Sequence, residues 1–338
     1  MGWKENTAVS PFNDTFKDHR RLLAQTVGGK NAEQFWPVEE RDQRKFLLHL
    51  IEEPQNLVEL IRRLEGSIML DIVYGYSVKG NNDPLVVRAE ETMDHFSQAT
   101  TPGAYMVEII PAMRFIPEWL PGGRFKKIAR EWGLHLRGTV EMPFEFAKKE
   151  MTAGKSRPSF TTQMLTEGEE SEELVKSAAF SLYTGGSDTV SFHTSLYTDY
   201  KSQNRFWQAV AALSIFFLLM ILNPDVQTKA QAEIDTVTQG QYLPTWSDRA
   251  KLPYIEAVML ECLRWGPIAP LAFPHRCMSQ DEFEGYRIPE GTLCIPNVWA
   301  TLHDPEYYTD PMKFSPERFL KDSPELDPRN IVFGFGRR

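Results

Sequence analysis

Apolar residues recur every three to four positions over most of the chain, which is the spacing of amphipathic helices. One helix is predicted over residues 39–50, and Pro54 ends it. Residues 111–123 interrupt the helical pattern, because they contain three prolines and two glycines. The clearest apolar face predicts a helix after Pro54; it comprises Leu57, Leu60, Ile61, Leu64, Ile68 and Ile72.

A further helix is expected after the acidic stretch 168–173, with Ser171 as its N-cap. The longest apolar run covers residues 209–222. As a helix it would extend for about 21 Å, short of the roughly 30 Å of a bilayer core, so we interpret it as a buried core helix. Two short strands are predicted between residues 283 and 295, about a Pro289-Glu290-Gly291 turn. The expected fold class is mainly α with a small β part.

Composition narrows the classes of function. The 338 residues include 37 Lys and Arg against 46 Asp and Glu, a net charge of −9, and such an acidic chain is not expected to bind nucleic acid. Hydrophobic residues make up 42%, which argues against disorder and against a polytopic membrane protein. The three cysteines, Cys262, Cys277 and Cys294, lack metal-site spacing and are interpreted as ordinary thiols.

Two short patterns could carry chemistry. Glu261 and Arg264 lie three residues apart on a predicted helix and can pair, although taken alone the pair could equally be a surface ion pair. Two glycines at 185 and 186 cost a helix about 1 kcal/mol each, so they indicate either a close approach, a distortion or a helix end. Asp188 and Thr189 follow them as an acid and a hydroxyl that can relay protons.

The C-terminal Gly334-x-Gly336 could begin a dinucleotide fingerprint. That motif needs a third glycine, a following helix and a βαβ unit, none of which the pattern of the chain predicts, so we reject it.

Taken in order, these segments resemble the cytochrome P-450 (P450) family of haem-thiolate monooxygenases. The segment ending in Asp188-Thr189 resembles the distal helix, and Glu261-x-x-Arg264 resembles the Glu-x-x-Arg motif. Pro316-Glu-Arg318-Phe resembles the Pro-Glu-Arg-Phe motif, and Phe333-x-x-Gly336-x-Arg338 resembles the front half of the cysteine-ligand motif. The segment 16–20, Phe-Lys-Asp-His-Arg, resembles Trp-x-x-x-Arg with Phe in place of Trp. Short stretches of sequence such as GYRIPEGT are similar to those of fungal microsomal members from secondary-metabolite pathways.

The resemblance implies roles for several residues. Arg20, His275 and Arg338 would hold the propionates of haem (heme b), and Asp188 and Thr189 would deliver protons to the reacting oxygen. The roles implied for Glu261, Arg264 and Arg318 are structural, in a buried charge network.

The same resemblance implies a monooxygenase that inserts one atom of O2 into a hydrophobic small molecule. Its partner would be NADPH-cytochrome P450 reductase, at the cytoplasmic face of the endoplasmic reticulum.

The chain departs from the family pattern in three places. The pattern puts the axial cysteine two residues beyond Arg338, where the sequence ends, and it puts an N-terminal anchor and first strands before residue 1. Residues 191–209 form a polar insertion in the distal helix that is foreign to the family. We interpret the insertion as a translated intron, with a surface loop as the alternative.

These departures lead us to expect a single P450 domain over residues 1–338 that is incomplete at both ends. The alternative to a monooxygenase is a non-catalytic fragment or pseudogene product without the axial cysteine. A helical binding module unrelated to haem would require four ordered motifs to coincide by chance.

Overall fold

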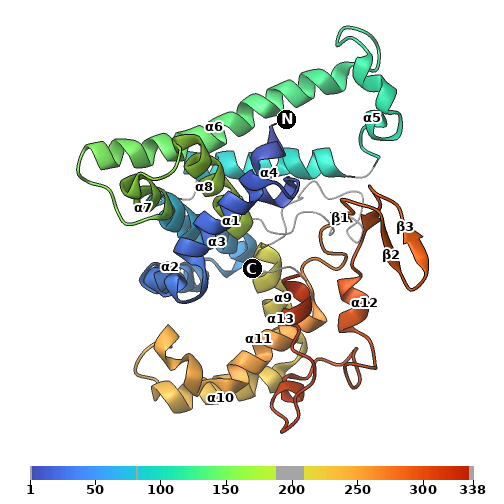
Figure 1. Ribbon diagram of the computed structural model, residues 1–338. Coiled ribbons are helices and arrows are strands. Elements are labelled where there is room, and N and C mark those ends of the chain that lie inside the picture. The colour runs from blue at the N-terminus through green and yellow to red at the C-terminus, as the bar shows by residue number, and fades with distance from the viewer. Residues whose placement is uncertain (1, 81–82, 102, 188–208, 335–338) are drawn as a thin grey trace. The chain divides into compact units, whose positions relative to one another are not determined.

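The computed structural model describes residues 2–80, 83–101, 103–187 and 209–334 (Figure 1). Most of these residues are helical, and strands occur only in a late, short segment, so the predicted mainly α fold with a small β part is confirmed. The sequence alone predicts one domain over 1–338. Contacts group the described residues into two compact units: unit 1 runs to residue 187 and unit 2 starts at residue 210.

Unit 1 is built from helices throughout its described part. In chain order they are η1 (Trp3–Glu5), η2 (Thr7–Val9), α1 (Asp14–Val27), η3 (Gly29–Phe35), α2 (Trp36–Glu52), η4 (Pro54–Asn56), α3 (Leu57–Tyr74), α4 (Pro84–Thr100), α5 (Met106–Ile109), η5 (Pro111–Phe115), α6 (Arg124–Thr152), α7 (Phe160–Glu167) and α8 (Glu172–Ser187).

Unit 2 combines helices with short strands. Its elements are α9 (Ala209–Leu222), α10 (Pro224–Thr238), η7 (Trp246–Lys251), α11 (Pro253–Trp265), β1 (His275–Arg276), β2 (Asp281–Phe283), β3 (Tyr286–Ile288), β4 (Leu293–Cys294), α12 (Val298–Leu302), η8 (Pro316–Phe319) and α13 (Arg329–Val332).

The predicted helices of unit 1 are confirmed. α2 contains the predicted segment 39–50, and α3 buries Leu60, Ile61 and Leu64 of the apolar face. The Ser171 hydroxyl accepts a 3.3 Å hydrogen bond from the backbone N–H of Leu174. Ser171 therefore caps the start of α8, where an otherwise unpaired helix N–H needs an acceptor.

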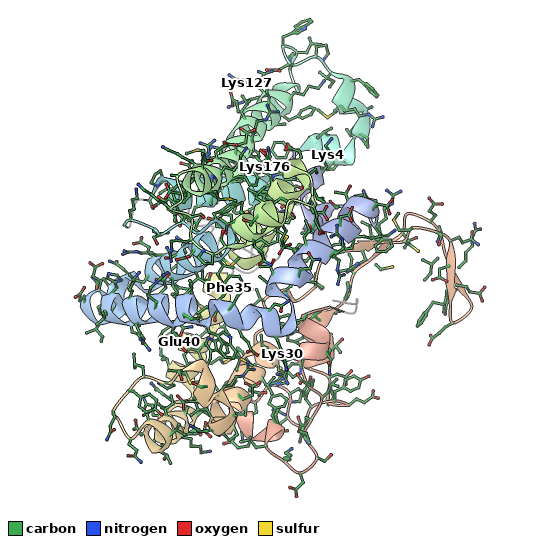
Figure 2. All side chains as sticks on the ribbon, turned by 60° about the vertical axis from the view of Figure 1, so that its left-hand side comes forward. Lys4, Lys30, Phe35, Glu40, Lys127 and Lys176 are labelled. Atoms are coloured by element: carbon green, nitrogen blue, oxygen red, sulfur yellow. The ribbon has the colours of Figure 1, made fainter. Side chains whose placement is uncertain are left out.

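The core of unit 1 forms around α8, which packs against α1, α3, α6 and α7. Val175 and Ala178 of α8 are fully buried, as are Val73 of α3 and Phe144 of α6. Small residues on α8 let the larger side chains of its neighbours approach closely. Charged side chains cover the outside, as at Lys30 and Lys127 (Figure 2).

A charged network joins α2, α3 and the α6–α7 connection inside unit 1. The buried Asp71 carboxylate accepts hydrogen bonds from Arg41 at 2.8 Å and from Arg157 at 2.7 Å. Burial disfavours the charged form of the neighbouring Asp42, but hydrogen bonds from Arg41, Lys45 and Ser67 outweigh it and lower the pKa of Asp42 to about 2. Asp42 is therefore ionised at neutral pH, and the hydrogen bonds to the two carboxylates join α2, α3 and the α6–α7 connection.

The strand pairing corrects the sequence-based expectation. Segments 286–288 and 293–294 flank the Pro-Glu-Gly turn as strands, but they do not pair with each other. β3 pairs with β2 about Glu284-Gly285, where both residues have positive φ, and β4 pairs with β1. The tighter turn at 284–285 forms the hairpin because glycine adopts positive φ without strain.

The apolar run 209–222 is helical, as predicted, but it is not buried on all sides. Leu219 and Met220 of α9 are buried, whereas Leu218, Ile221 and Leu222 are exposed. Only one stripe of α9 packs in the cluster with Val226 and Val258. The predicted insertion, residues 191–209, lies outside the described residues except for its last position, and its interpretation as an intron stays a prediction.

The core position of Phe144 yields a stability prediction. Phe144→Ala is expected to lower the free energy of unfolding by about 3–5 kcal/mol, because the fully buried ring leaves a cavity among α3, α6 and α8. Phe115→Ala is the control, since Phe115 is 72% exposed. Urea unfolding followed by circular dichroism measures both; equal losses for the two variants would contradict the assignment of Phe144 to the core.

Candidate functional site

The Glu261 carboxylate is the centre of a buried ionic cluster in unit 2. Nε and Nη2 of Arg264 donate to its two oxygens, each at 2.8 Å, in a two-pronged pair. Nε of Arg318, from η8, donates to the same carboxylate at 3.1 Å. Glu261 and Arg264 are fully buried and Arg318 nearly so, which excludes the surface ion pair that the sequence left open.

The two guanidinium groups also bind backbone carbonyls of the irregular C-terminal segment. Nη1 of Arg264 donates to the carbonyl oxygens of Leu302 at 2.9 Å and Pro311 at 2.8 Å. Arg318 donates to the carbonyls of Thr309 and Lys313. Because buried carbonyls outside regular structure need donors, these bonds fix a segment that has few ladder hydrogen bonds of its own.

The other residues of η8 hold the same segment against α10. Glu317 accepts hydrogen bonds from Lys229 of α10 and from the Tyr254 hydroxyl of α11. Burial raises the pKa of Glu317, but the Lys229 contact and the other hydrogen bonds dominate and lower it to about 2. In the Pro-Glu-Arg-Phe motif, Glu317 thus binds Lys229 and Tyr254, whereas Arg318 binds Glu261.

Sequence reasoning missed two members of this cluster. The backbone N–H of Ser315 donates to Glu261 at 2.8 Å, and Glu325 forms a second ion pair with Arg318. No motif marks Glu325, because it reaches Arg318 through a turn of the irregular segment. A count of charges could have given a hint, since one carboxylate cannot balance two buried guanidinium groups.

Arg20 lies on α1 with its guanidinium carbon 5.7 Å from the centre of the Phe16 ring. It is half-buried, and no carboxylate in the described part of the chain lies within ion-pair distance of it. The adjacent His19 is fully buried and anchors α1, with ring nitrogens 2.9 Å from the Thr7 hydroxyl and 2.7 Å from the Ser177 hydroxyl. Arg20 is therefore a positioned cation suited to an anionic group.

His275 stands on β1, directly opposite Cys294 of β4. Its side chain is exposed, and Arg276 follows it on the same short strand. Arg20 and His275 belong to different units, so each is placed only within its own unit. Asp188, Thr189 and Arg338 lie outside the described residues; α8 reaches Ser187, one position before Asp188.

The propionates of haem are carboxylates, and Arg20 and His275 are donors that fit such groups. Cys262 does not fit the role of a thiolate ligand. Burial, and secondly the nearby Glu261, raise the pKa of Cys262 to about 12, so its thiol stays protonated. Over residues 2–334 with their gaps, no cluster of three or more His, Cys, Asp and Glu side chains could hold a metal ion.

Gly185 does not mark a close contact in the described structure. α8 continues through it as a regular helix, and a Cβ added there would meet no described atom within 4 Å. The reason for a glycine at this position therefore stays a prediction.

Comparison with known proteins places the chain among P450 sequences. The family model for cytochrome P450 matches residues 209–338. The chain is 41% identical to cytochrome P450 monooxygenase 208 of Postia placenta, over 100% of this chain and 64% of that protein. It is also 41% identical to cytochrome P450 monooxygenase claR of Ampulloclitocybe clavipes, over 100% of this chain and 61% of that protein. The chain thus spans less than two thirds of either relative.

The fold comparison agrees. A solved structure of a zebrafish cytochrome P450 with progesterone superposes with a TM-score of 0.70, covering 94% of this chain and 70% of that one at 20% identity. At this identity the likeness concerns the fold alone, and it confirms the predicted P450 fold.

The ionic cluster yields a second prediction. Arg264→Ala is expected to cost about 3–5 kcal/mol of unfolding free energy, because it removes one partner of a buried pair and takes the Arg264 donor from the carbonyls of Leu302 and Pro311. Arg249→Ala breaks an exposed pair with Glu256 beside the same helix and should cost less than about 1 kcal/mol. Denaturant midpoints for the two variants that coincide would contradict the buried role of Arg264.

Proposed function

Because the chain belongs to the cytochrome P450 family, whose cofactor is haem, we propose that it acts as a haem-dependent monooxygenase. The reaction is the insertion of one oxygen atom of O2 into a hydrophobic small molecule. The observation that carries the proposal is the 41% identity to fungal cytochrome P450 monooxygenases over the whole of this chain. The fungal relatives also support a role in secondary metabolism.

When bound, haem supplies the iron at which O2 is activated. The chain's own contribution begins with positioning. Arg20, His275 and Arg338 would hold the propionates by hydrogen bonds, which are stronger when a partner is charged. No carboxylate among the described residues lies within ion-pair distance of Arg20, which supports this role in unit 1.

Asp188 and Thr189 are proposed to move protons to the reacting oxygen, as a carboxyl group and a hydroxyl that follow α8 directly. Glu261, Arg264 and Arg318 act differently. They fix the backbone between α12 and η8.

Members of this family receive electrons from a redox partner. For this chain we propose NADPH-cytochrome P450 reductase, at the cytoplasmic face of the endoplasmic reticulum. No helix among the described residues is long and apolar enough to cross a membrane. An exposed apolar segment between α4 and α6 supports contact with a membrane surface; it comprises Met106, Ile109, Ile110, Phe115 and Trp119.

The function is tested with the complete protein that contains this chain, co-expressed with a fungal cytochrome P450 reductase. Incubation of cell extracts with 18O2 and NADPH is expected to yield products that are heavier by one 18O atom, detected by mass spectrometry. A threonine-to-alanine change at 189 should lower product formation per O2 consumed. Haem-loaded protein that gives no labelled product with any hydrophobic extract would favour the non-catalytic alternative.

Haem retention tests the role of Arg20 separately. Arg20→Leu is expected to weaken haem binding about tenfold or more, because a charge-assisted hydrogen bond is worth about 1.5–3 kcal/mol. Arg21→Leu is the neighbouring control, since Arg21 already pairs with Asp18 and Glu170 at the surface. Haem per polypeptide after purification measures both, and equal retention in the two variants would remove Arg20 from the site.

A further inference from the structure

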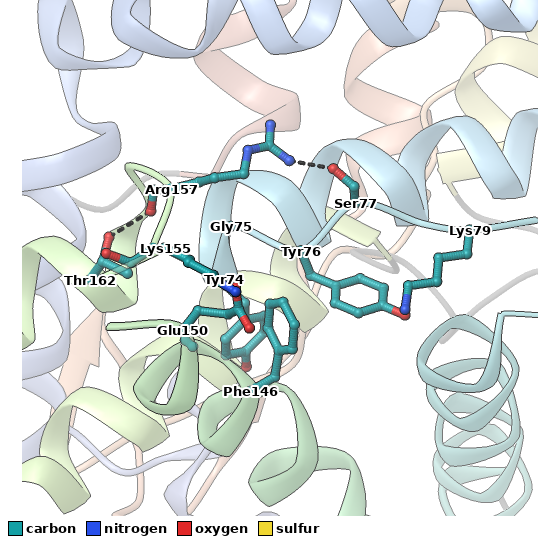
Figure 3. Close-up of a pocket in the computed structure, with 12 residues that line it drawn as sticks. Tyr74, Gly75, Tyr76, Ser77, Lys79, Phe146, Glu150, Lys155, Arg157 and Thr162 are labelled. Carbon is teal, nitrogen blue, oxygen red and sulfur yellow. Dashed lines mark hydrogen bonds between the residues drawn. The ribbon is translucent and has the colours of Figure 1, made fainter. Parts of the chain in front are cut away.

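A cavity of about 170 Å³ lies within unit 1, at the C-terminal ends of α3 and α6 and beside the α6–α7 connection (Figure 3). All of its lining residues belong to unit 1, and none of them is among the residues assigned to haem. They are Tyr74, Gly75, Tyr76, Ser77, Lys79, Phe146, Ala147, Glu150, Lys155, Ser156, Arg157 and Thr162.

One part of the lining is aromatic and firmly packed. Tyr74 and Tyr76 are buried at the end of α3, and Phe146 of α6 meets Tyr76 edge to face with ring centres 4.9 Å apart. The Tyr76 hydroxyl is fixed by a 2.9 Å hydrogen bond to the buried Asp83. These rings form a preformed apolar wall, against which a planar ring can pack.

Cations line the rest of the cavity. Lys79 and Lys155 are exposed, and in the described part of the chain neither has a carboxylate within 4 Å. Arg157 is held by Asp71 and by the Ser77 hydroxyl, so its position is set by the fold (Figure 3). An incoming anion would therefore find two ammonium groups that form no ion pair with a described carboxylate.

The carboxylates near the cavity, apart from Glu150, already accept hydrogen bonds from other residues. Asp71 is shared between Arg41 and Arg157, and Asp83 accepts from Tyr76 and from the backbone N–H groups of Lys79 and Leu85. Glu150 is the acidic residue in the lining itself. It forms no ion pair in the described structure, so it remains the one lining charge that repels an anion.

The size of the cavity limits the ligand. A cavity of about 150 Å³ accommodates benzene, so about 170 Å³ accommodates one aromatic ring with a small substituent. We propose that this cavity binds a single-ring aromatic carboxylate, with the ring against Tyr76 and Phe146 and the carboxylate between Lys79 and Lys155. None of its lining residues is assigned to haem, and the proposal does not depend on the proposed function.

The test uses the full chain and three fluorinated probes observed by 19F NMR titration. 4-Fluorobenzoate has the ring and the charge, 4-fluorobenzyl alcohol lacks the charge, and fluoroacetate lacks the ring. 4-Fluorobenzoate is expected to bind at least about tenfold more tightly than either of the others. Its affinity should fall as salt is raised, because the lysines are exposed and screened.

Three charge variants locate the binding site. Lys155→Gln should weaken 4-fluorobenzoate binding about fivefold, whereas Glu150→Gln should strengthen it about twofold, because it removes the repelling charge. Lys149→Gln is the matched control, an exposed α6 lysine outside the lining, and should leave binding unchanged. All three positions lie outside the core, so circular dichroism should show native folding.

Two results would overturn the proposal. Equal binding of the alcohol and the benzoate would exclude recognition of the charge. A Lys155→Gln variant that binds 4-fluorobenzoate as the Lys149→Gln control does would place the ligand elsewhere in the protein.

Discussion

Unit 2 depends on one buried carboxylate. Glu261 accepts hydrogen bonds from two guanidinium groups and one backbone N–H, and those guanidinium groups in turn bind the carbonyls of a segment that has little secondary structure. Taking such charges out of water is costly, so the cluster is favourable only when every member is in place. This requirement lets a short helix define the path of the backbone between Leu302 and Lys313.

The helices could be predicted from the sequence, because a helix with one buried face has apolar residues every three to four positions. The α3 face from Leu57 to Ile72 is the clearest case. Strand pairing was not predictable, since each strand of unit 2 has only two or three residues, too few for alternation to specify a partner. The exposed side of α9 was missed because its composition is apolar all round, which carries no information about direction.

The ionic site was predictable only in part. Glu261 and Arg264 are one helical turn apart, so their pairing follows from local geometry. Arg318 was expected through family resemblance, whereas Glu325 and the carbonyl acceptors depend on turns that leave no pattern in the sequence. The cavity in unit 1 was also not predictable, because Lys79 and Lys155 are far apart in the chain and line one cavity only through the packing of α3 against α6.

The shared carboxylate of Asp71 has a consequence for synthesis on the ribosome. Arg41 precedes it and is available at once, but Arg157 follows 86 residues later. At about 5–20 residues per second, Arg157 emerges roughly 4–17 seconds after Asp71. During that interval α2 and α3 can already be joined through Arg41, while water can occupy the position beside Asp71 that Arg157 later takes. The nascent chain therefore passes through a state in which Asp71 is paired with Arg41 but not yet with Arg157. The speed of translation sets how long this state persists.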